Sequence, residues 1–156
     1  MDRRACPFGS LLAGIKNTGG GFMITSVNNG QVKNIIHLNQ KSKARREQGL
    51  FVAEGVKMFE EAPKTWVEKV YVSDSFSKNQ DLMDKVCCFP YEITADPVFR
   101  QMCDTKTPQG ILTVLKKPSY NIEDIFSRPD PLLMVLEDLQ DPGNAGTIIR
   151  SGEGAG

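Results

Sequence analysis

The chain has 156 residues, enough for one ordinary domain or for one small domain and part of another. Its 19 Lys and Arg residues balance its 19 Asp and Glu residues, so any surface that binds a nucleic acid must be local. No apolar run approaches the roughly 20 residues of a membrane span, and no signal-peptide pattern opens the chain. We therefore expect a soluble, cytoplasmic protein without a membrane partner.

The cysteines and the single histidine do not indicate a metal site. Cys6, Cys87, Cys88 and Cys103 have no CxxC spacing, and His37 is the only imidazole that could join them as a ligand. We expect reduced, structural cysteines and no bound metal.

The first 22 residues are rich in glycine and have no periodicity, so we expect a disordered extension. Met23 is a second possible start of the protein, and the sequence does not decide between Met1 and Met23. From Gln31 to Gln48 the apolar residues recur at helical spacing, which predicts two short helices or one bent helix that ends at Gly49.

The end of this helical region is the most basic part of the chain. It could be an ordinary solvated face, but it is also the best candidate for sequence-independent contacts to phosphate groups. The candidate RNA-binding residues in it are Lys41, Lys43, Arg45 and Arg46.

Strand-like and helix-like patterns alternate through the middle of the chain, which predicts the α/β class. Phe51, in the first strand, could stack on an RNA base or pack in the core. Pro90 predicts that its strand lies at an edge or a bend, and Asp96 is the expected N-cap of the helix at 96–102. We expect strands at 50–53, 66–72 and 87–93 and after the polar loop that begins at Asp104, and helices at 54–62, 79–86 and 96–102.

A polar, proline-broken stretch at 116–120 is typical of a linker, and a short helix is expected over 121–127. The apolar run that begins at Pro131 predicts a buried strand of a parallel sheet. A turn of sequence Asp-Pro-Gly-Asn follows, and we expect Asn144 to cap a helix that contains Arg150. Asn144 and Arg150 would then project from neighbouring parts of one surface, where open α/β folds place their ligands.

The segment Leu-Glu-Asp-Leu-Gln-Asp-Pro-Gly-Asn-Ala-Gly-Thr-Ile-Ile-Arg, residues 136–150, closely resembles the first signature motif of the SpoU (TrmH) family of RNA ribose 2′-O-methyltransferases, which belong to the SPOUT trefoil-knot class. Two further segments resemble the family's N-terminal substrate-binding domain. They are the Lys-x-Arg…Gly-x-Phe-x-x-Glu-Gly pattern at 43–55 and the Thr-x-Thr-Pro-Gln-Gly-Ile stretch at 105–111.

This resemblance implies a small α/β/α RNA-binding domain followed by the first strand and helix of an incomplete SPOUT domain. We expect an extension over residues 1–22, an RNA substrate-binding domain over 23–117, a linker over 118–130 and the start of a methyltransferase domain over 131–156. The implied function is ribose 2′-O-methylation of RNA with S-adenosylmethionine as methyl donor. Ribosomal RNA is the favoured substrate over transfer RNA. The alternative is a non-enzymatic RNA-binding module.

The resemblance assigns Asn144 and Arg150 to substrate binding and catalysis. A guanidinium has a pKa above about 12 and no acceptor, so Arg150 is better suited to position the ribose and stabilise a developing oxyanion than to act as a base. The family's later motifs, which hold the cofactor, have no counterpart before Gly156, so we expect no cofactor-binding residue in this chain and no activity from it alone. Family members are usually homodimers, and for this chain the oligomeric state is left open.

Overall fold

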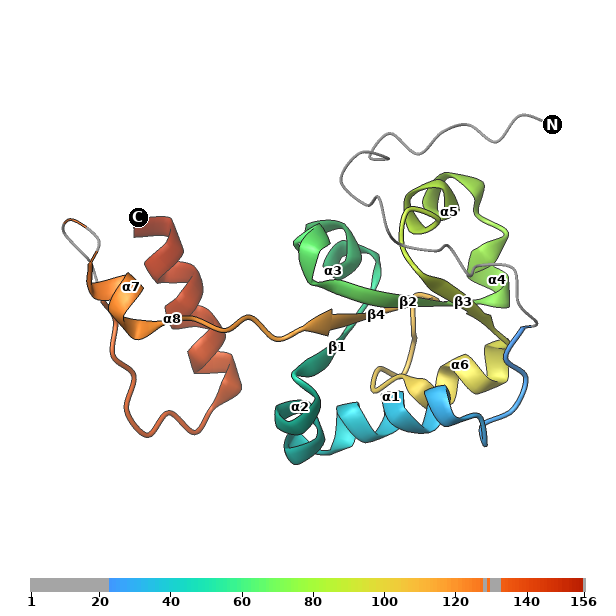
Figure 1. Ribbon diagram of the computed structural model, residues 1–156, viewed down its shortest axis with the longest axis horizontal. Helices are drawn as coiled ribbons and strands as arrows, with labels where there is room; N and C mark the ends of the chain where they lie inside the picture. Colours follow the sequence, from blue (N-terminus) through green and yellow to red (C-terminus); the bar gives the residue numbers. More distant parts are fainter. Residues whose placement is uncertain (1–22, 128, 130–132, 156) are drawn as a thin grey trace. The chain divides into compact units, whose positions relative to one another are not determined.

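A computed structural model gives the structure of residues 23–127, 129 and 133–155. The chain divides into two compact units, of which the first ends at Pro118 and the second begins at Ser119 (Figure 1). The expected extension over residues 1–22 lies outside the described residues. Among those residues, no helix is both long and apolar enough to cross a lipid bilayer.

The first unit alternates helices and strands as its sequence pattern predicts. Its elements are α1 (Gly30–Gln40), α2 (Ser42–Gln48), β1 (Leu50–Glu54), α3 (Val56–Glu61), the 3₁₀ helix η1 (Lys64–Trp66), β2 (Val67–Ser73), α4 (Asp74–Ser77), α5 (Gln80–Val86), β3 (Tyr91–Thr94), α6 (Asp96–Met102) and β4 (Ile111–Lys116). The second unit contains α7 (Ile122–Phe126) and α8 (Pro142–Ala155). The α/β class is confirmed.

The four strands form one sheet in the order β1-β4-β2-β3. The β1–β4 and β4–β2 pairs are antiparallel, whereas β2 and β3 are parallel and are joined by the crossover through α4 and α5. β3 lies at the edge of this sheet, as Pro90 predicts, and beyond it Ile24 makes an isolated parallel bridge to Thr94.

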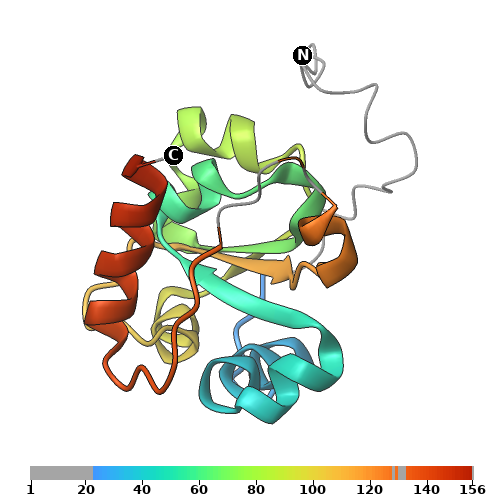
Figure 2. The ribbon, with the colours of Figure 1, turned by 90° about the vertical axis from the view of Figure 1, so that its left-hand side faces the viewer.

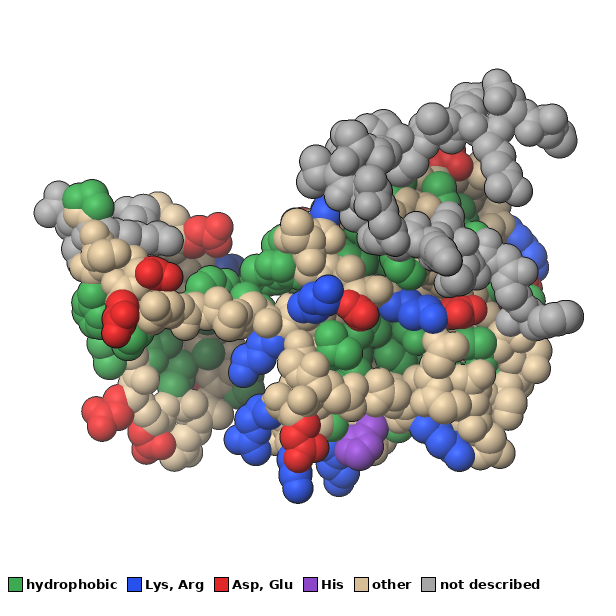
Figure 3. Space-filling model, viewed as in Figure 1, with side chains coloured by type: hydrophobic (Ala, Val, Ile, Leu, Met, Phe, Trp, Pro, Cys, Tyr) green, Lys and Arg blue, Asp and Glu red, His purple; other side chains and the backbone are tan. Residues whose placement is uncertain are grey.

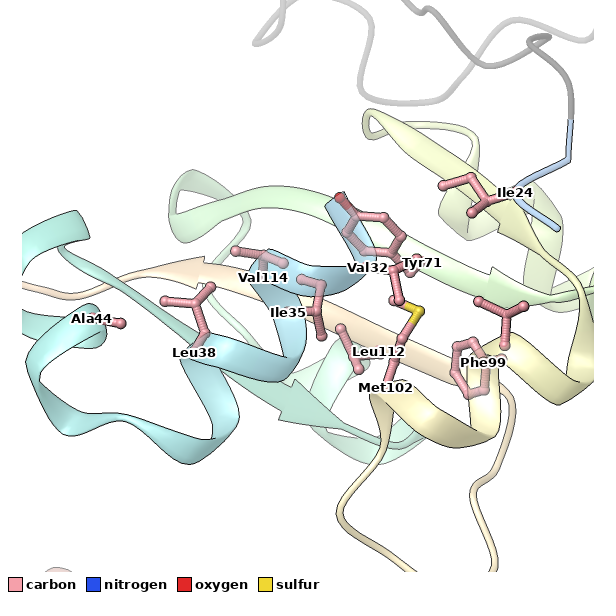
Figure 4. Packing of buried hydrophobic residues seen from close by; sticks show 11 residues of the cluster. Ile24, Val32, Ile35, Leu38, Ala44, Tyr71, Phe99, Met102, Leu112 and Val114 are labelled. Atoms are coloured by element: carbon pink, nitrogen blue, oxygen red, sulfur yellow. The ribbon is translucent and has the colours of Figure 1, made fainter. Parts of the chain in front are cut away.

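Helices cover both faces of the sheet and make three layers (Figures 1 and 2). On one face, Val32, Ile35 and Leu38 of α1 pack with residues of α6 and with Leu112 and Val114 of β4 (Figure 4). On the other face, a second cluster joins α3, α4 and α5 to the alternate residues of the strands. Because both faces are buried, β4 is a nearly continuous apolar run.

The helical region at 31–48 is two helices that meet at Lys41, whose backbone is extended. Asn29 caps α1 by accepting a hydrogen bond from the Gln31 N–H at 2.8 Å. Gly49 ends α2 with φ of 64°, the left-handed conformation that glycine adopts at helix ends. The predicted end at Gly49 is confirmed, and of the two alternatives, two short helices or one bent helix, the structure has the two helices.

Several predicted boundaries are wrong. The strand expected over 87–93 begins only at Tyr91, because Pro90 has no N–H for a ladder. The N-cap of α6 is Ala95, and the carboxylate of Asp96 instead accepts hydrogen bonds from the side chain and the N–H of Ser75, which lower its pKa. The helix expected from Glu54 begins at Val56, because Gly55 has φ of 105°. Cys88 is disulfide-bonded, so the prediction of reduced cysteines is wrong there.

The second unit differs most from its predicted structure. Residues 133–137 are not a strand, and the apolar side chains among them are exposed, because a strand needs hydrogen-bonded neighbours and the described residues provide none beside this segment. Residues 131 and 132 of the expected strand lie outside the described residues. Asn144 is not the cap of α8. The helix begins two residues earlier at Pro142, and the Asp141 carboxylate accepts a hydrogen bond from the Gly143 N–H at 2.7 Å.

Candidate nucleic-acid interface

The basic segment predicted from the sequence forms an exposed corner between α1 and α2. Lys41, Lys43 and Arg46 are exposed at this corner, and Lys43 makes a loose ion pair with Glu47 at 3.7 Å. Figure 3 shows Lys and Arg side chains gathered on the surface around α2. The structure thus brings three of the predicted RNA-binding residues to solvent, two of them on α2 and Lys41 at the junction that precedes it.

Arg45 plays a different role from its neighbours. Its Nη1 donates hydrogen bonds to the carbonyl oxygens of Leu38, at 2.6 Å, and Asn39, at 2.8 Å. These carbonyls belong to the last turn of α1, which has no helical partner for them. Arg45 therefore stabilises the corner from inside, and a contact from it to RNA stays a prediction.

Side-chain hydrogen bonds hold the corner in place. Asn34 of α1 and Gln48 of α2 exchange two hydrogen bonds, at 3.1 and 2.9 Å. The Asn39 amide donates to the carbonyl of Met102 in α6 at 2.8 Å, and Ala44 of α2 is buried in the core. These three contacts fix the backbone that carries the exposed cations. A fixed backbone lowers the entropy lost on binding an anionic ligand.

Phe51 is half-buried in β1, where it pairs with Leu115 and packs against the cluster that joins α3 to α5. This contact explains the residue as part of the core. Stacking of Phe51 on an RNA base stays a prediction.

Two segments that carry the family resemblance, some fifty residues apart, interlock in the structure. The half-buried carboxylate of Glu54 accepts hydrogen bonds from the N–H of Asp104, at 3.3 Å, and from the N–H and hydroxyl of Thr105. In return, the Gln109 side-chain oxygen accepts a hydrogen bond from the Val56 N–H at 2.9 Å. The sequence predicted Glu54 at the start of a helix and a polar loop from Asp104, and it did not predict the contact between them.

Gly55 allows the close approach of Gln109, and Gly110 allows a second close approach, of this loop to Ser73 and Phe76. A Cβ on Gly55 would lie 3.0 Å from the Gln109 oxygen, and one on Gly110 would lie 2.8 Å from the Ser73 hydroxyl. Both glycines have positive φ, which other residues adopt only with strain. The interlocked loop leaves Thr105, Lys106 and Thr107 exposed at its tip.

The Glu54 carboxylate also influences the pKa of Cys103. Burial, and then the nearby Glu54 carboxylate, raises the pKa of the Cys103 thiol to about 12. Since the thiolate is the nucleophile, we expect iodoacetamide to alkylate Cys103 in the folded chain roughly tenfold or more slowly than in urea. Glu54→Gln should speed the alkylation of folded Cys103, because it removes the carboxylate's charge.

Site-resolved mass spectrometry would measure these rates, with Glu60→Gln on α3 as the control, because Glu60 pairs with Lys85 at a different place. Equal alkylation rates in the Glu54 variant and the unchanged chain would contradict an electrostatic effect of this carboxylate on Cys103.

A polar network at the other edge of the sheet is internal. The Gln31 side-chain oxygen accepts hydrogen bonds from Lys69 Nζ and from the Tyr71 hydroxyl, both at 2.8 Å, and Lys69 also pairs with Glu92 at 2.9 Å. Burial raises the pKa of Tyr71 above its ordinary range. Each of these four side chains has a partner within the network, so its role is to join α1 to β2 and β3.

In the second unit, both predicted catalytic residues are exposed on α8. Asn144 lies in its first turn, and Arg150 follows six residues later. Six residues of an α-helix correspond to a rise of about 9 Å and leave the two side chains about 120° apart. A ligand that contacts both must therefore extend around the helix.

The described residues of the second unit do not fit a buried cofactor. None of residues 133–154 is buried, whereas a site for a molecule of the size of S-adenosylmethionine encloses most of its surface. Across the part of the chain that the structure describes, no three His, Cys, Asp or Glu side chains gather as metal ligands.

Comparison with known proteins gives a consistent result. Residues 29–113 match the model of the MRM3-like substrate binding domain. The chain is 30% identical over 135 residues to the 23S rRNA (guanosine(2553)-2′-O)-methyltransferase RlmP of Bacillus subtilis, a match that covers 85% of this chain and 51% of that protein. It is also 30% identical over 119 residues to the human mitochondrial rRNA methyltransferase 3, covering 72% of this chain and 28% of that protein. The chain thus spans about half the length of the Bacillus subtilis relative. It spans 28% of the human one.

Solved structures share the fold. The crystal structure of an RNA 2′-O ribose methyltransferase has a TM-score of 0.67 at 24% identity, covering 86% of this chain and 53% of that one. An rRNA methyltransferase from Sinorhizobium meliloti with bound AdoMet has a TM-score of 0.62 at 24% identity, covering 86% and 51%.

Proposed function

The chain belongs to the family of the MRM3-like substrate-binding domain, and we propose that it takes part in the methylation of ribose 2′-hydroxyl groups in RNA. Ribosomal RNA is the favoured substrate. The observation that carries this proposal is the match over residues 29–113, together with relatives that are named as rRNA methyltransferases. These relatives do not favour the alternative of a non-enzymatic RNA-binding module. A cytoplasmic location is part of the same proposal, and homodimer formation is proposed only for full-length members of the family.

The first unit is the RNA-binding part. Support comes from the exposed cations of the corner between α1 and α2. Hydrogen bonds hold this corner in one geometry. Lysine and arginine contacts to phosphates are independent of sequence and place an RNA on a protein without selecting its bases. We assign this positioning role to Lys41, Lys43 and Arg46, with Arg45 holding the corner and Phe51 as a candidate for stacking.

The second unit carries the residues for the reaction centre. Methyl transfer to a ribose hydroxyl needs the nucleotide to be held in line with the methyl donor and the hydroxyl oxygen to be stabilised as it loses its proton. Arg150 suits the second task through its fixed positive charge, and Asn144 suits orientation of the ribose through hydrogen bonds. S-adenosylmethionine, which supplies the methyl group, would be held by residues other than those described.

Isothermal titration calorimetry tests this division of roles. We expect no saturable heat when S-adenosylmethionine is added to this chain, because residues 133–154 form no enclosed site. With tritiated S-adenosylmethionine and ribosomal RNA, the chain should incorporate no label, while the same preparation should bind the RNA.

The RNA-binding measurement is the positive control for the preparation. Saturable cofactor binding would show that residues 133–154 build a cofactor site unlike the one expected. Failure of the chain to bind any RNA would contradict the proposed function itself.

A further inference from the structure

The pairing of β1 with β4 brings a second pair of lysines to the basic corner. Leu50, the first residue of β1, is the register partner of Lys116 at the end of β4. One residue further, the Lys117 N–H donates a hydrogen bond to the carbonyl of Gly49 at 2.7 Å, directly after the end of α2. Residues that are some seventy positions apart in sequence therefore share one surface.

Positive charge on this combined surface exceeds negative charge. Lys43 and Lys116 each have a carboxylate partner, Glu47 at 3.7 Å and Glu68 at 3.1 Å. Within residues 23–127, 129 and 133–155, no ion pair involves the three other cations, which are Lys41, Arg46 and Lys117. All five cations are exposed, so three positive charges remain available to an anionic partner.

We propose that Lys117, with Lys116 beside it, completes a composite RNA-binding surface made of Lys41, Lys43, Arg46, Lys116 and Lys117. This inference rests on the proposed function and adds residues that the sequence pattern assigned to a linker. Flexible lysine side chains around a fixed backbone suit the phosphates of an RNA strand, whose charges recur along its length. The hydrogen bond to Gly49 fixes the backbone of Lys117, as Arg45 fixes that of the corner.

The position of Lys117 has a consequence for the two-unit chain. Lys117 directly precedes Pro118, where the first unit ends. RNA held by this surface would therefore reach the point from which the chain continues towards Asn144 and Arg150.

Fluorescence anisotropy with a labelled RNA hairpin tests the composite surface, with the full chain as the protein. Lys117→Gln should weaken binding several-fold and lower the slope of log affinity against log salt by about 0.7–0.9, the value for one lost phosphate contact. Lys57→Gln is the matched control, because Lys57 is also an exposed lysine and lies at the start of α3, past the other end of β1. The control should leave both affinity and slope unchanged.

The possible outcomes separate this inference from the proposed function. If Lys43→Gln weakens binding and Lys117→Gln does not, RNA binding stands and the composite surface is wrong. Equal competition by poly-glutamate at matched charge would show that the surface binds any acidic polymer and would also overturn the inference. No binding by the unchanged chain would contradict both. In urea, Lys117→Gln is expected to unfold at the same midpoint as the unchanged chain, because the backbone hydrogen bond from residue 117 to Gly49 remains.

Discussion

Gly110→Ala is expected to lower the free energy of unfolding of the first unit by about 2–5 kcal/mol. The left-handed backbone, with φ of 86°, costs an alanine about 1–2 kcal/mol. Its Cβ would also lie 2.8 Å from the Ser73 hydroxyl and 2.9 Å from the Phe76 Cβ, and relief of such crowding costs about 1–3 kcal/mol. Domains are typically stable by only about 5–15 kcal/mol, so the change should be large.

The crowding has a structural reason. The Gly110 carbonyl accepts a hydrogen bond from the Ser73 N–H at 2.9 Å, and the Ser73 hydroxyl accepts one from the Phe76 N–H at 3.1 Å to cap α4. Ser73 and Phe76 are both buried. An alanine at this position must therefore displace the cap as well as a core aromatic ring.

Urea unfolding followed by the fluorescence of Trp66, the only tryptophan of the chain, would measure the change in the first unit. Gly49→Ala is the matched control, because Gly49 has φ of 64° but no atom within 4 Å of its added Cβ. It should cost only the backbone strain of about 1–2 kcal/mol. Equal losses in the two variants would contradict the crowding at Gly110.

Replacement of Lys41, Lys43 and Arg46 together by glutamine is expected to abolish most of the affinity of the chain for RNA. Three lost phosphate contacts should lower the slope of log affinity against log salt by about two to three. Loss of affinity should be similar for RNAs of different sequence, because phosphate contacts carry no sequence information. Filter binding over a range of salt concentrations would measure both quantities.

The control for this variant removes the same charge from the other face of the sheet. Lys57, Lys78 and Lys85 lie on α3, at the end of α4 and on α5, and each makes an exposed ion pair. Their joint replacement by glutamine should leave RNA affinity close to that of the unchanged chain. If the two triple variants lose affinity equally, RNA binding follows the net charge of the chain and not the α1–α2 corner.

Local patterns predicted most elements of the first unit. The periodicity over 31–48, the apolar runs that became β1, β2 and β4, and the resemblance to the SpoU (TrmH) family are all confirmed. Helix starts were less predictable: α6 is capped by Ala95, and the Asp96 carboxylate bonds Ser75, a residue twenty-one positions away in the chain. The predicted strand from Pro131 was wrong over 133–136, because apolar composition supplies a strand's burial but not its hydrogen-bonding neighbours.

The sequence by itself determined the α/β class, the family resemblance and the basic character of the corner, because each depends on residue types over short spans. Only the tertiary structure decided that Arg45 turns inward to the α1 carbonyls while Arg46 faces solvent. It also decided that Glu54 holds the loop at Thr105 and that Lys117 joins the basic corner. Those contacts join residues far apart in the chain, and strand register and helix packing set them, so no local pattern could contain them.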